Sequence, residues 1–107
     1  MEIILYSEND CEDCKDLKRR LTEANIKFEN KDLDEKSDNL MNMFPNKWEH
    51  TDLIRDYNLP PWVPKVVIKN NDNMTFVCSS NKTGNKGNIF IAEDNEKLFN
   101  TIVELID

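Results

Sequence analysis

The stretch "YSENDCEDCKDLKRRL" (residues 6–21) decides the fold predicted for this 107-residue chain. Cys11 and Cys14 stand two residues apart in it, directly after the short apolar run Glu2–Tyr6, which is typical of a buried strand. The apolar positions that follow recur at the i, i+3, i+7, i+10 spacing of one helical face: Cys14, Leu17, Leu21 and Ala24. We therefore predict a strand, a tight connection and then a helix that begins near Cys11.

Asn9 or Asp10 suits the N-cap of that helix. Further along the chain, the pattern predicts a strand over 26–34, a strand from about Lys65, a turn at 70–73, a strand over 74–78, a polar loop over 79–88, a brief strand over 89–91, and a helix capped by Asp94 or Asn95. Residues 35–62 are ambiguous, because "DNLMNMF" and "EHTDLIRDY" each suit a helix, with a break at Pro45. The order β-α-β-(α)-β-β-α indicates one α/β domain over residues 1–107, with a mixed four-stranded sheet flanked by helices.

Composition and charge restrict the partners of this domain. The net charge of −7 argues against binding to nucleic acid or to an anionic membrane surface, since both need clustered Lys and Arg. No basic leader with a long apolar segment is visible, and no run approaches the roughly 20 apolar residues of a membrane span. An odd count of three cysteines suits a reducing compartment, so we expect a cytoplasmic monomer.

The Cys-x-x-Cys pair suits redox chemistry at a helix N-terminus. Unpaired N–H groups and the helix dipole favour a thiolate at Cys11, whereas Cys14 lies one turn further along the inward face. Cys11 would therefore attack a substrate disulfide, and Cys14 would resolve the mixed disulfide. Glu12 and Asp13 oppose the thiolate, which predicts a reducing potential nearer to about −270 mV than to about −120 mV.

Two other functions remain open for the pair. A four-coordinate zinc needs two further ligands, and only Cys78 and His50 remain, far apart in sequence. A non-catalytic scaffold that docks a partner, with or without a metal, is the alternative from another class. We expect Cys78 to pack within a strand and His50 to be an ordinary surface or helix residue.

Four segments resemble the glutaredoxin family. These are the active-site segment 6–21, the second strand 26–34, "WVPKVVI" (62–68) as the Thr-Val-Pro segment with the third strand, and "DNEKLFNTIVELI" (94–106) as the last helix. The resemblance implies the thioredoxin-like fold and a thiol-disulfide oxidoreductase that reduces protein disulfides through Cys11 and Cys14. It makes ribonucleotide reductase a family-typical electron acceptor, with glutathione or a thioredoxin reductase-type enzyme as the source of electrons and no bound cofactor.

The resemblance also implies substrate-binding residues. Pro64 matches the family's cis-proline, and the backbone of Val63 would pair with the backbone of the substrate. Glu93 and Asp94 stand where the family has the Gly-Gly pair that helps to hold the γ-glutamyl end of glutathione. These carboxylates would repel the tripeptide, although a helix N-terminus still attracts an anion.

Four more side chains belong to the predicted neighbourhood of the site. Lys15 and Lys65 are the nearest candidate cations to compensate the acidic residues there. We expect Tyr6 to pack close to the site. For Trp62 two interpretations stay open, a flank of the substrate groove and plain packing.

Overall fold

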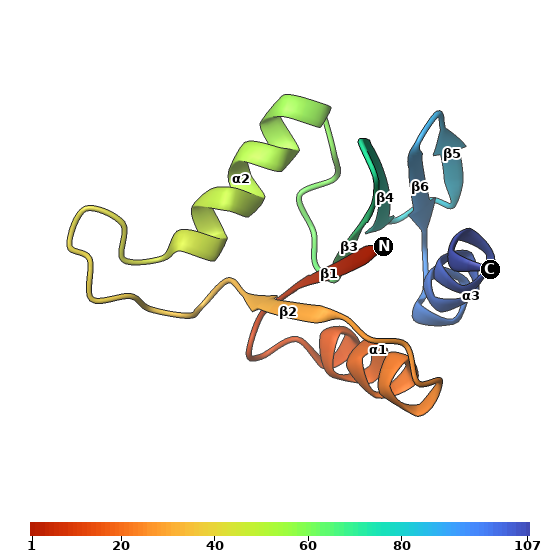
Figure 1. Cartoon of the computed structure of the whole chain (residues 1–107), viewed down its shortest axis with the longest axis horizontal. Helices are drawn as coiled ribbons and strands as arrows, with labels where there is room; N and C mark the ends of the chain where they lie inside the picture. Colours follow the sequence, from red (N-terminus) through yellow and green to blue (C-terminus); the bar gives the residue numbers. More distant parts are fainter.

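The structure is a computed structural model that describes all 107 residues. The elements in chain order are β1 (Glu2–Ser7), α1 (Glu12–Glu23), β2 (Glu29–Asp32), α2 (Pro45–Tyr57), β3 (Lys65–Asn70), β4 (Asn73–Ser79), β5 (Gly84–Lys86), β6 (Ile89–Ala92) and α3 (Asn95–Ile106). They form one six-stranded sheet in the order β2-β1-β3-β4-β6-β5 (Figure 1). The β1–β2 and β4–β6 pairs are parallel and the other pairs are antiparallel, so the predicted mixed sheet is confirmed.

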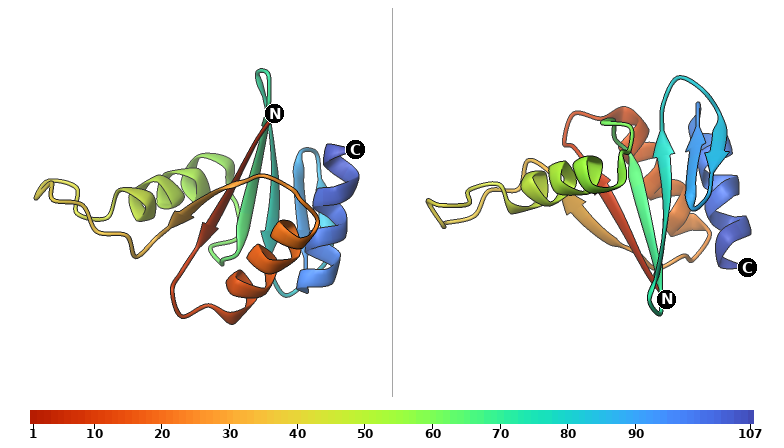
Figure 2. Two further views of the ribbon diagram at one scale, coloured as in Figure 1. Left: turned by 60° about the horizontal axis from the view of Figure 1, so that its bottom comes forward. Right: turned by 90° about the horizontal axis from the view of Figure 1, so that it is seen from above.

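The helices cover both faces of this sheet (Figures 1 and 2). Alternation along β1 sends Ile3 and Leu5 to the face covered by α1 and α3, where they join a cluster of ten buried apolar residues. Ile4 and Tyr6 point to the opposite face, where they join a second cluster with Cys78 and the residues around α2. The segment that carries Cys11 and Cys14 therefore follows a strand that is buried on both faces of the sheet.

The predicted first helix and the hairpin are confirmed. Cys14, Leu17 and Leu21 are fully buried on the inward face of α1, as their spacing requires. β3 begins at Lys65, and β3 and β4 form the expected antiparallel pair. Cys78 is buried in β4, as expected.

The sheet has six strands instead of the predicted four. The brief strand expected over 89–91 exists as β6, but Gly84–Lys86, which was expected to lie in a polar loop, forms β5 against it. Gly87 adopts the left-handed conformation (φ 61°) in the turn between them. All three residues of β5 are exposed, so the strand is held by backbone pairing and leaves no hydrophobic pattern in the sequence.

The second strand and the middle region also differ from expectation. β2 is confined to Glu29–Asp32, because Ile26 and Phe28 pack in the connection from α1 against the apolar cluster. "DNLMNMF" (38–44) is not helical. In that segment Ser37 Oγ donates to the Asn42 carbonyl oxygen (2.7 Å) and Asn39 Oδ1 accepts from the Met41 N–H (2.9 Å), and such side-chain bonds compete with a helix.

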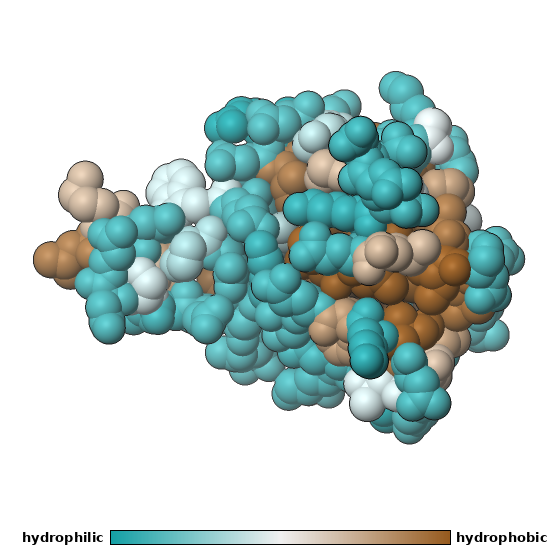
Figure 3. Space-filling view, in the orientation of Figure 1, coloured by the Kyte–Doolittle hydropathy of each residue, from teal (hydrophilic) through white to brown (hydrophobic).

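The segment between β2 and α2 reaches away from the sheet (Figures 1 and 2). The segment carries two exposed apolar side chains, Leu40 and Met41. Brown and tan atoms mark its outer end at the left of Figure 3. Pro45 occupies the first turn of α2, where its missing N–H costs no hydrogen bond. The second of the two ambiguous patterns is therefore the helical one.

Candidate active site

Cys11 and Cys14 lie at the start of α1, four residues after the end of β1. Cys11 is itself the N-cap, so the prediction that Asn9 or Asp10 caps the helix is wrong. Its Sγ accepts a hydrogen bond from the Cys14 N–H (3.1 Å), and the two Cα atoms are 5.2 Å apart with the sulfurs within disulfide distance. A sulfur can take this place because it is a weak acceptor for one of the unpaired N–H groups of the first turn.

The two sulfurs differ in access to solvent. Cys11 is half-buried, whereas Cys14 is fully buried against the sheet. An incoming disulfide therefore meets Cys11 first, and Cys14 can reach only the Cys11 sulfur. This is the order of access that attack followed by resolution needs.

Opposite electrostatic influences meet at Cys11. The N-terminus of α1 and the Cys14 N–H favour negative charge on its sulfur. Glu12 and Asp13 are exposed in the same turn and oppose that charge. Lys15 does not approach the sulfur as a free cation, because its ammonium pairs with Glu12 at 3.4 Å on the exposed surface.

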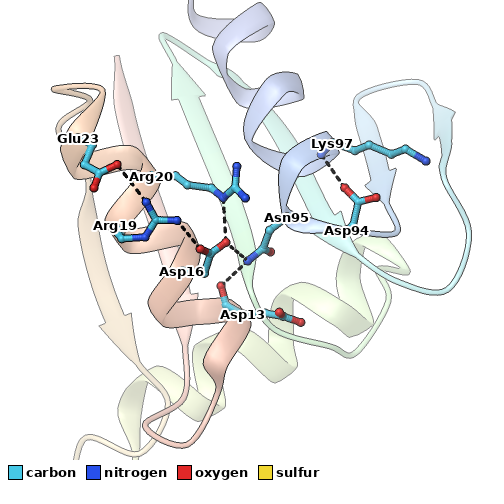
Figure 4. Close-up of polar contacts among 8 residues, drawn as sticks. All are labelled: Asp13, Asp16, Arg19, Arg20, Glu23, Asp94, Asn95 and Lys97. Carbon is cyan, nitrogen blue, oxygen red and sulfur yellow. Dashed lines mark hydrogen bonds and ion pairs between the residues drawn. The ribbon is translucent and has the colours of Figure 1, made fainter.

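The turn between the cysteines is tied to α3, a contact that the sequence did not predict. Figure 4 shows Asn95 Nδ2 donating to the Asp13 carbonyl oxygen (2.8 Å) and to Asp16 Oδ2 (3.0 Å). Asp16 also accepts from Arg19 (2.6 Å) and Arg20 (2.8 Å). Hydrogen bonds from Arg20, Asn95 and Arg19 hold the pKa of Asp16 well below its usual range.

The signal for half of this network was in the sequence. Asp16, Arg19 and Arg20 stand at the i, i+3 and i+4 spacing of helical ion pairs. Nothing in the pattern pairs Asn95 with a residue some eighty positions earlier. Asn95 therefore enters the site only through the fold.

The segment before β3 lies at the same end of the sheet as the cysteines (Figure 2). The Val63–Pro64 peptide bond is cis, Pro64 is buried and Val63 is half-buried. The Pro64 carbonyl oxygen accepts from the Ser79 N–H (3.4 Å) and from Ser79 Oγ (3.0 Å) on β4. We refer to residues 60–64 as the proline loop.

Trp62 is 57 % exposed at the surface of this loop. More than half of its side chain therefore lies outside the core, and the two interpretations of Trp62 stay predictions. Val63, in contrast, packs partly against the apolar cluster beneath α2.

Lys65 is not the surface cation that the sequence suggested. It is fully buried, and its Nζ lies 2.8 Å from His50 Nε2 and donates to the Trp62 carbonyl oxygen (3.1 Å). His50, expected as an ordinary surface or helix residue, is buried on α2. The alternation of side chains along β3 places Lys65 on the same face of the sheet as Val67, beneath α2. No pattern in the sequence predicted that His50 would be its partner.

Tyr6 packs in the interior, as expected, and its hydroxyl has a definite partner. The hydroxyl donates a short hydrogen bond to Glu49 of α2, and Glu49 also accepts from Lys31 (2.7 Å). Burial, followed by the neighbouring Glu49, raises the pKa of Tyr6. Tyr6 lies one strand away from Lys65, with which it is paired in the sheet.

Asp94 is engaged by its own helix. Its Oδ1 accepts from the Lys97 N–H (2.8 Å) as the N-cap of α3 (Figure 4). The ammonium of Lys97 forms an ion pair with Glu93. One of the N–H groups through which this helix end would bind an anion is therefore already occupied by a carboxylate.

The surface around Cys11 is open. None of the surface cavities is lined by Cys11, Cys14, Val63 or Pro64. No three His, Cys, Asp or Glu side chains converge as metal ligands would, and none of the helices is long and apolar enough to cross a membrane.

The arrangement defines a class of protein: a Cys-x-x-Cys disulfide at a helix N-terminus, after a central strand of a mixed sheet, marks a site of the thiol-disulfide oxidoreductase type. A family model described as Glutaredoxin matches residues 3–72, and the chain belongs to the glutaredoxin family. The predicted thioredoxin-like fold follows from that membership. No curated protein and no solved structure matches the chain.

Proposed function

We propose that this protein is a dithiol oxidoreductase that reduces protein disulfides through Cys11 and Cys14. The observation that carries the proposal is the unequal access of the two sulfurs, with Cys11 half-buried at the helix N-terminus and Cys14 sealed behind it. A structural disulfide would gain nothing from such an arrangement, whereas an exchange reaction depends on it.

The reaction runs in two displacements. The Cys11 thiolate attacks one sulfur of the substrate disulfide, which forms a mixed disulfide and releases the other substrate sulfur as a thiolate that takes a proton from water. Cys14 then attacks Cys11 Sγ and gives up its proton, and the second substrate sulfur leaves as a thiolate that takes up a proton. Two electrons have passed to the substrate.

The proline loop and Trp62 supply the binding surface in this proposal. Val63 offers backbone groups next to the buried cis-Pro64, and the exposed Trp62 indole flanks them. The partial exposure of Cys11, which lines no cavity, favours a protein substrate, with ribonucleotide reductase as one acceptor of this kind. The protein would work as a monomer in the cytoplasm.

Recharging needs two electrons from outside the chain, from glutathione or from a thioredoxin reductase-type enzyme. The occupied N-terminus of α3 and the carboxylates of Glu93 and Asp94 weigh against a tightly bound glutathione. Lys15 is already paired, and Lys65 is buried, so neither compensates those carboxylates. We therefore favour the reductase.

A trapping experiment tests the proposal. The Cys14→Ser variant retains the attacking sulfur but cannot resolve, so it should hold an insulin chain as a mixed disulfide that dithiothreitol releases. The Cys11→Ser variant is the matched control and should trap nothing. If both variants behave alike, or if the wild type does not reduce insulin, the protein is instead a non-catalytic module that docks a partner.

A further inference from the structure

Lys65 makes a buried bridge between α2 and the proline loop. It is the first residue of β3 and directly follows cis-Pro64, and its ammonium is entirely shielded from solvent. A buried lysine is rare unless its charge is paired or fully hydrogen-bonded. Here the partners of Nζ are a histidine nitrogen, His50 Nε2, at 2.8 Å and a backbone oxygen, that of Trp62, at 3.1 Å, and no carboxylate pairs with it.

The second partner connects the bridge to the candidate site. Trp62 is the residue before Val63, so the hydrogen bond to its carbonyl oxygen fixes the peptide that leads into the cis bond. On the far side of the same loop, Ser79 holds the Pro64 carbonyl oxygen. Val63 is thus flanked by two anchored carbonyl groups, one held through Lys65 and the other through Ser79.

His50 in turn fixes Lys65 to α2. Its ring lies against Tyr6, with the ring centroids 5.5 Å apart, and it is 4 % exposed. Burial and, after it, the nearby ammonium of Lys65 lower the pKa of His50 to about 4. At neutral pH the imidazole is therefore uncharged, and one of its nitrogens can accept a hydrogen bond from the lysine.

Lys65 is the one cation buried between the sheet and α2, because the other titratable groups that face it are neutral or paired. Cys78 stands opposite it on β4 and Tyr6 opposite it on β1. Burial raises the pKa of Cys78 to about 11, so its thiol is neutral. The charges of Glu49 and Lys31 are paired with each other beyond the ring of Tyr6.

We propose that Lys65 and His50 are positioning residues for disulfide exchange: the bridge from His50 through Lys65 to the Trp62 carbonyl oxygen holds the proline loop so that Val63 can receive a substrate beside Cys11. This inference rests on the proposed function, because it assigns a role at the same site. Neither side chain touches the sulfurs or a substrate, so both act through the loop.

A polar bridge suits this task better than an apolar contact of the same volume. Replacing both partners of a buried hydrogen bond with apolar side chains of similar volume is often nearly neutral for stability, whereas the hydrogen bond itself fixes direction as well as distance. Stability and positioning are therefore separable in this interior.

The double variant His50→Leu/Lys65→Met separates the two contributions. It removes the bridge and leaves no unpaired charge, so we expect a folded protein with a melting temperature close to that of the wild type. Turnover of insulin with dithiothreitol as reductant should fall about tenfold, mainly through a higher KM, because a mobile loop binds the substrate backbone less well. Reaction of the reduced variant with the small reagent dipyridyl disulfide should keep its wild-type rate, because this reagent needs only the Cys11 sulfur.

Lys31→Met is the matched control. It also cuts a polar link of α2, the ion pair with Glu49 at 2.7 Å, but that link does not reach the proline loop. We expect it to leave the insulin KM unchanged.

His50→Gln provides the rescue. The amide oxygen of Gln can accept from Lys65, so this variant should retain most of the insulin activity that His50→Leu loses. As the pH falls from 6 towards 4, His50 of the wild type takes up a proton and can no longer accept from Lys65, whereas Gln does not titrate. The ratio of the insulin rate of His50→Gln to that of the wild type should therefore rise over this range. The effect of pH on the thiols cancels in the ratio, because both proteins have the same cysteines.

The outcomes separate the inference from the function on which it rests. If the wild type fails to reduce insulin, the proposed function fails. If the wild type is active and the double variant either keeps its insulin KM or loses the insulin and dipyridyl disulfide reactions equally, the positioning role is overturned.

Discussion

The two faces of the sheet are held in different ways. Beneath α1 and α3 lies a cluster of ten apolar side chains, among them Leu17 and Leu98. Beneath α2 a buried lysine and histidine and the hydroxyl of Tyr6 lie among the apolar residues. An apolar cluster stabilises through area removed from water and tolerates small shifts, whereas a buried polar group must keep its partner. The face that meets the proline loop is the one with the stricter requirement.

The largest effect should come from breaking the polar face on one side only. His50→Leu leaves the buried Lys65 ammonium without the nitrogen that now lies 2.8 Å from it. The ammonium then keeps only the Trp62 carbonyl oxygen. The loss of one partner of a buried charged group costs about 3 kcal/mol of unfolding free energy, whereas the double variant with Lys65→Met should stay within about 1 kcal/mol of the wild type. Urea denaturation at pH 7 measures both. A single variant that is no less stable than the double one would show that the pair carries no penalty of this kind.

The polar face should also give the stability a pH dependence. The pKa of folded His50 is about 4, below its ordinary 6.5, so the unfolded chain takes up a proton at this residue as the pH falls through 6.5 while the folded chain resists it until about 4. Its contribution to stability is therefore full above pH 6.5 and is lost between pH 6.5 and 4, by about 3 kcal/mol in total.

Comparison of variants isolates this contribution from the carboxylates that titrate in the same range. The stability of His50→Gln, measured by urea denaturation, should fall less than that of the wild type between pH 6.5 and 4. Leu98→Ala, on the apolar face, should lower the free energy of unfolding by about 2–5 kcal/mol, and this difference from the wild type should be the same at every pH. Parallel curves for the wild type and His50→Gln would contradict the burial of a neutral histidine.

The same contrast explains how much could be predicted from the sequence. Apolar periodicity placed α1, the β3–β4 hairpin and α3, because burial of Leu17 or Leu98 is a local consequence of spacing. The Lys65–His50 bridge was not predicted, because a buried polar pair forms only when two particular elements pack together. The spacing of residues along the chain does not show which elements do so. The exposed strand β5 escaped for a related reason: it is held by backbone pairing alone.

The candidate site divides in the same way. The order of Cys11 and Cys14 on the helix and the cis peptide bond at Pro64 could be inferred from local sequence and family resemblance. The N-cap role of Cys11 and the Asn95 contact could not, because one is a detail of side-chain direction and the other joins α1 to α3 across the fold.

Asn95→Ala should have a smaller effect, because it removes a link between two helices that an apolar interface already joins. The amide donates to the Asp13 carbonyl oxygen and to Asp16, which keeps its two arginine partners without it. We expect a loss of about 1 kcal/mol in urea denaturation. Asn95→Asp is the informative comparison, since a carboxylate next to Asp16 should cost more than the alanine. If the two substitutions are equal, Asn95 does not contact α1 in solution.

The smallest effect should come from charges that water already screens. Glu12 and Asp13 are exposed beside Cys11, so replacing both with their amides, Glu12→Gln/Asp13→Asn, removes two repulsions that act on the thiolate through solvent. A better stabilised thiolate favours the reduced form and raises the redox potential, by about 10–20 mV, because exposed charges contribute of the order of 0.5–1 kcal/mol and 30 mV corresponds to about 1.4 kcal/mol.

Equilibration of the double amide variant with a glutathione buffer measures this shift in potential, and added salt should make the shift smaller. Asn100→Asp, at an exposed position of α3, provides a charge-changing control that should leave the potential unchanged. An unchanged or lower potential in the double amide variant would contradict the prediction that Glu12 and Asp13 lower the potential of this site.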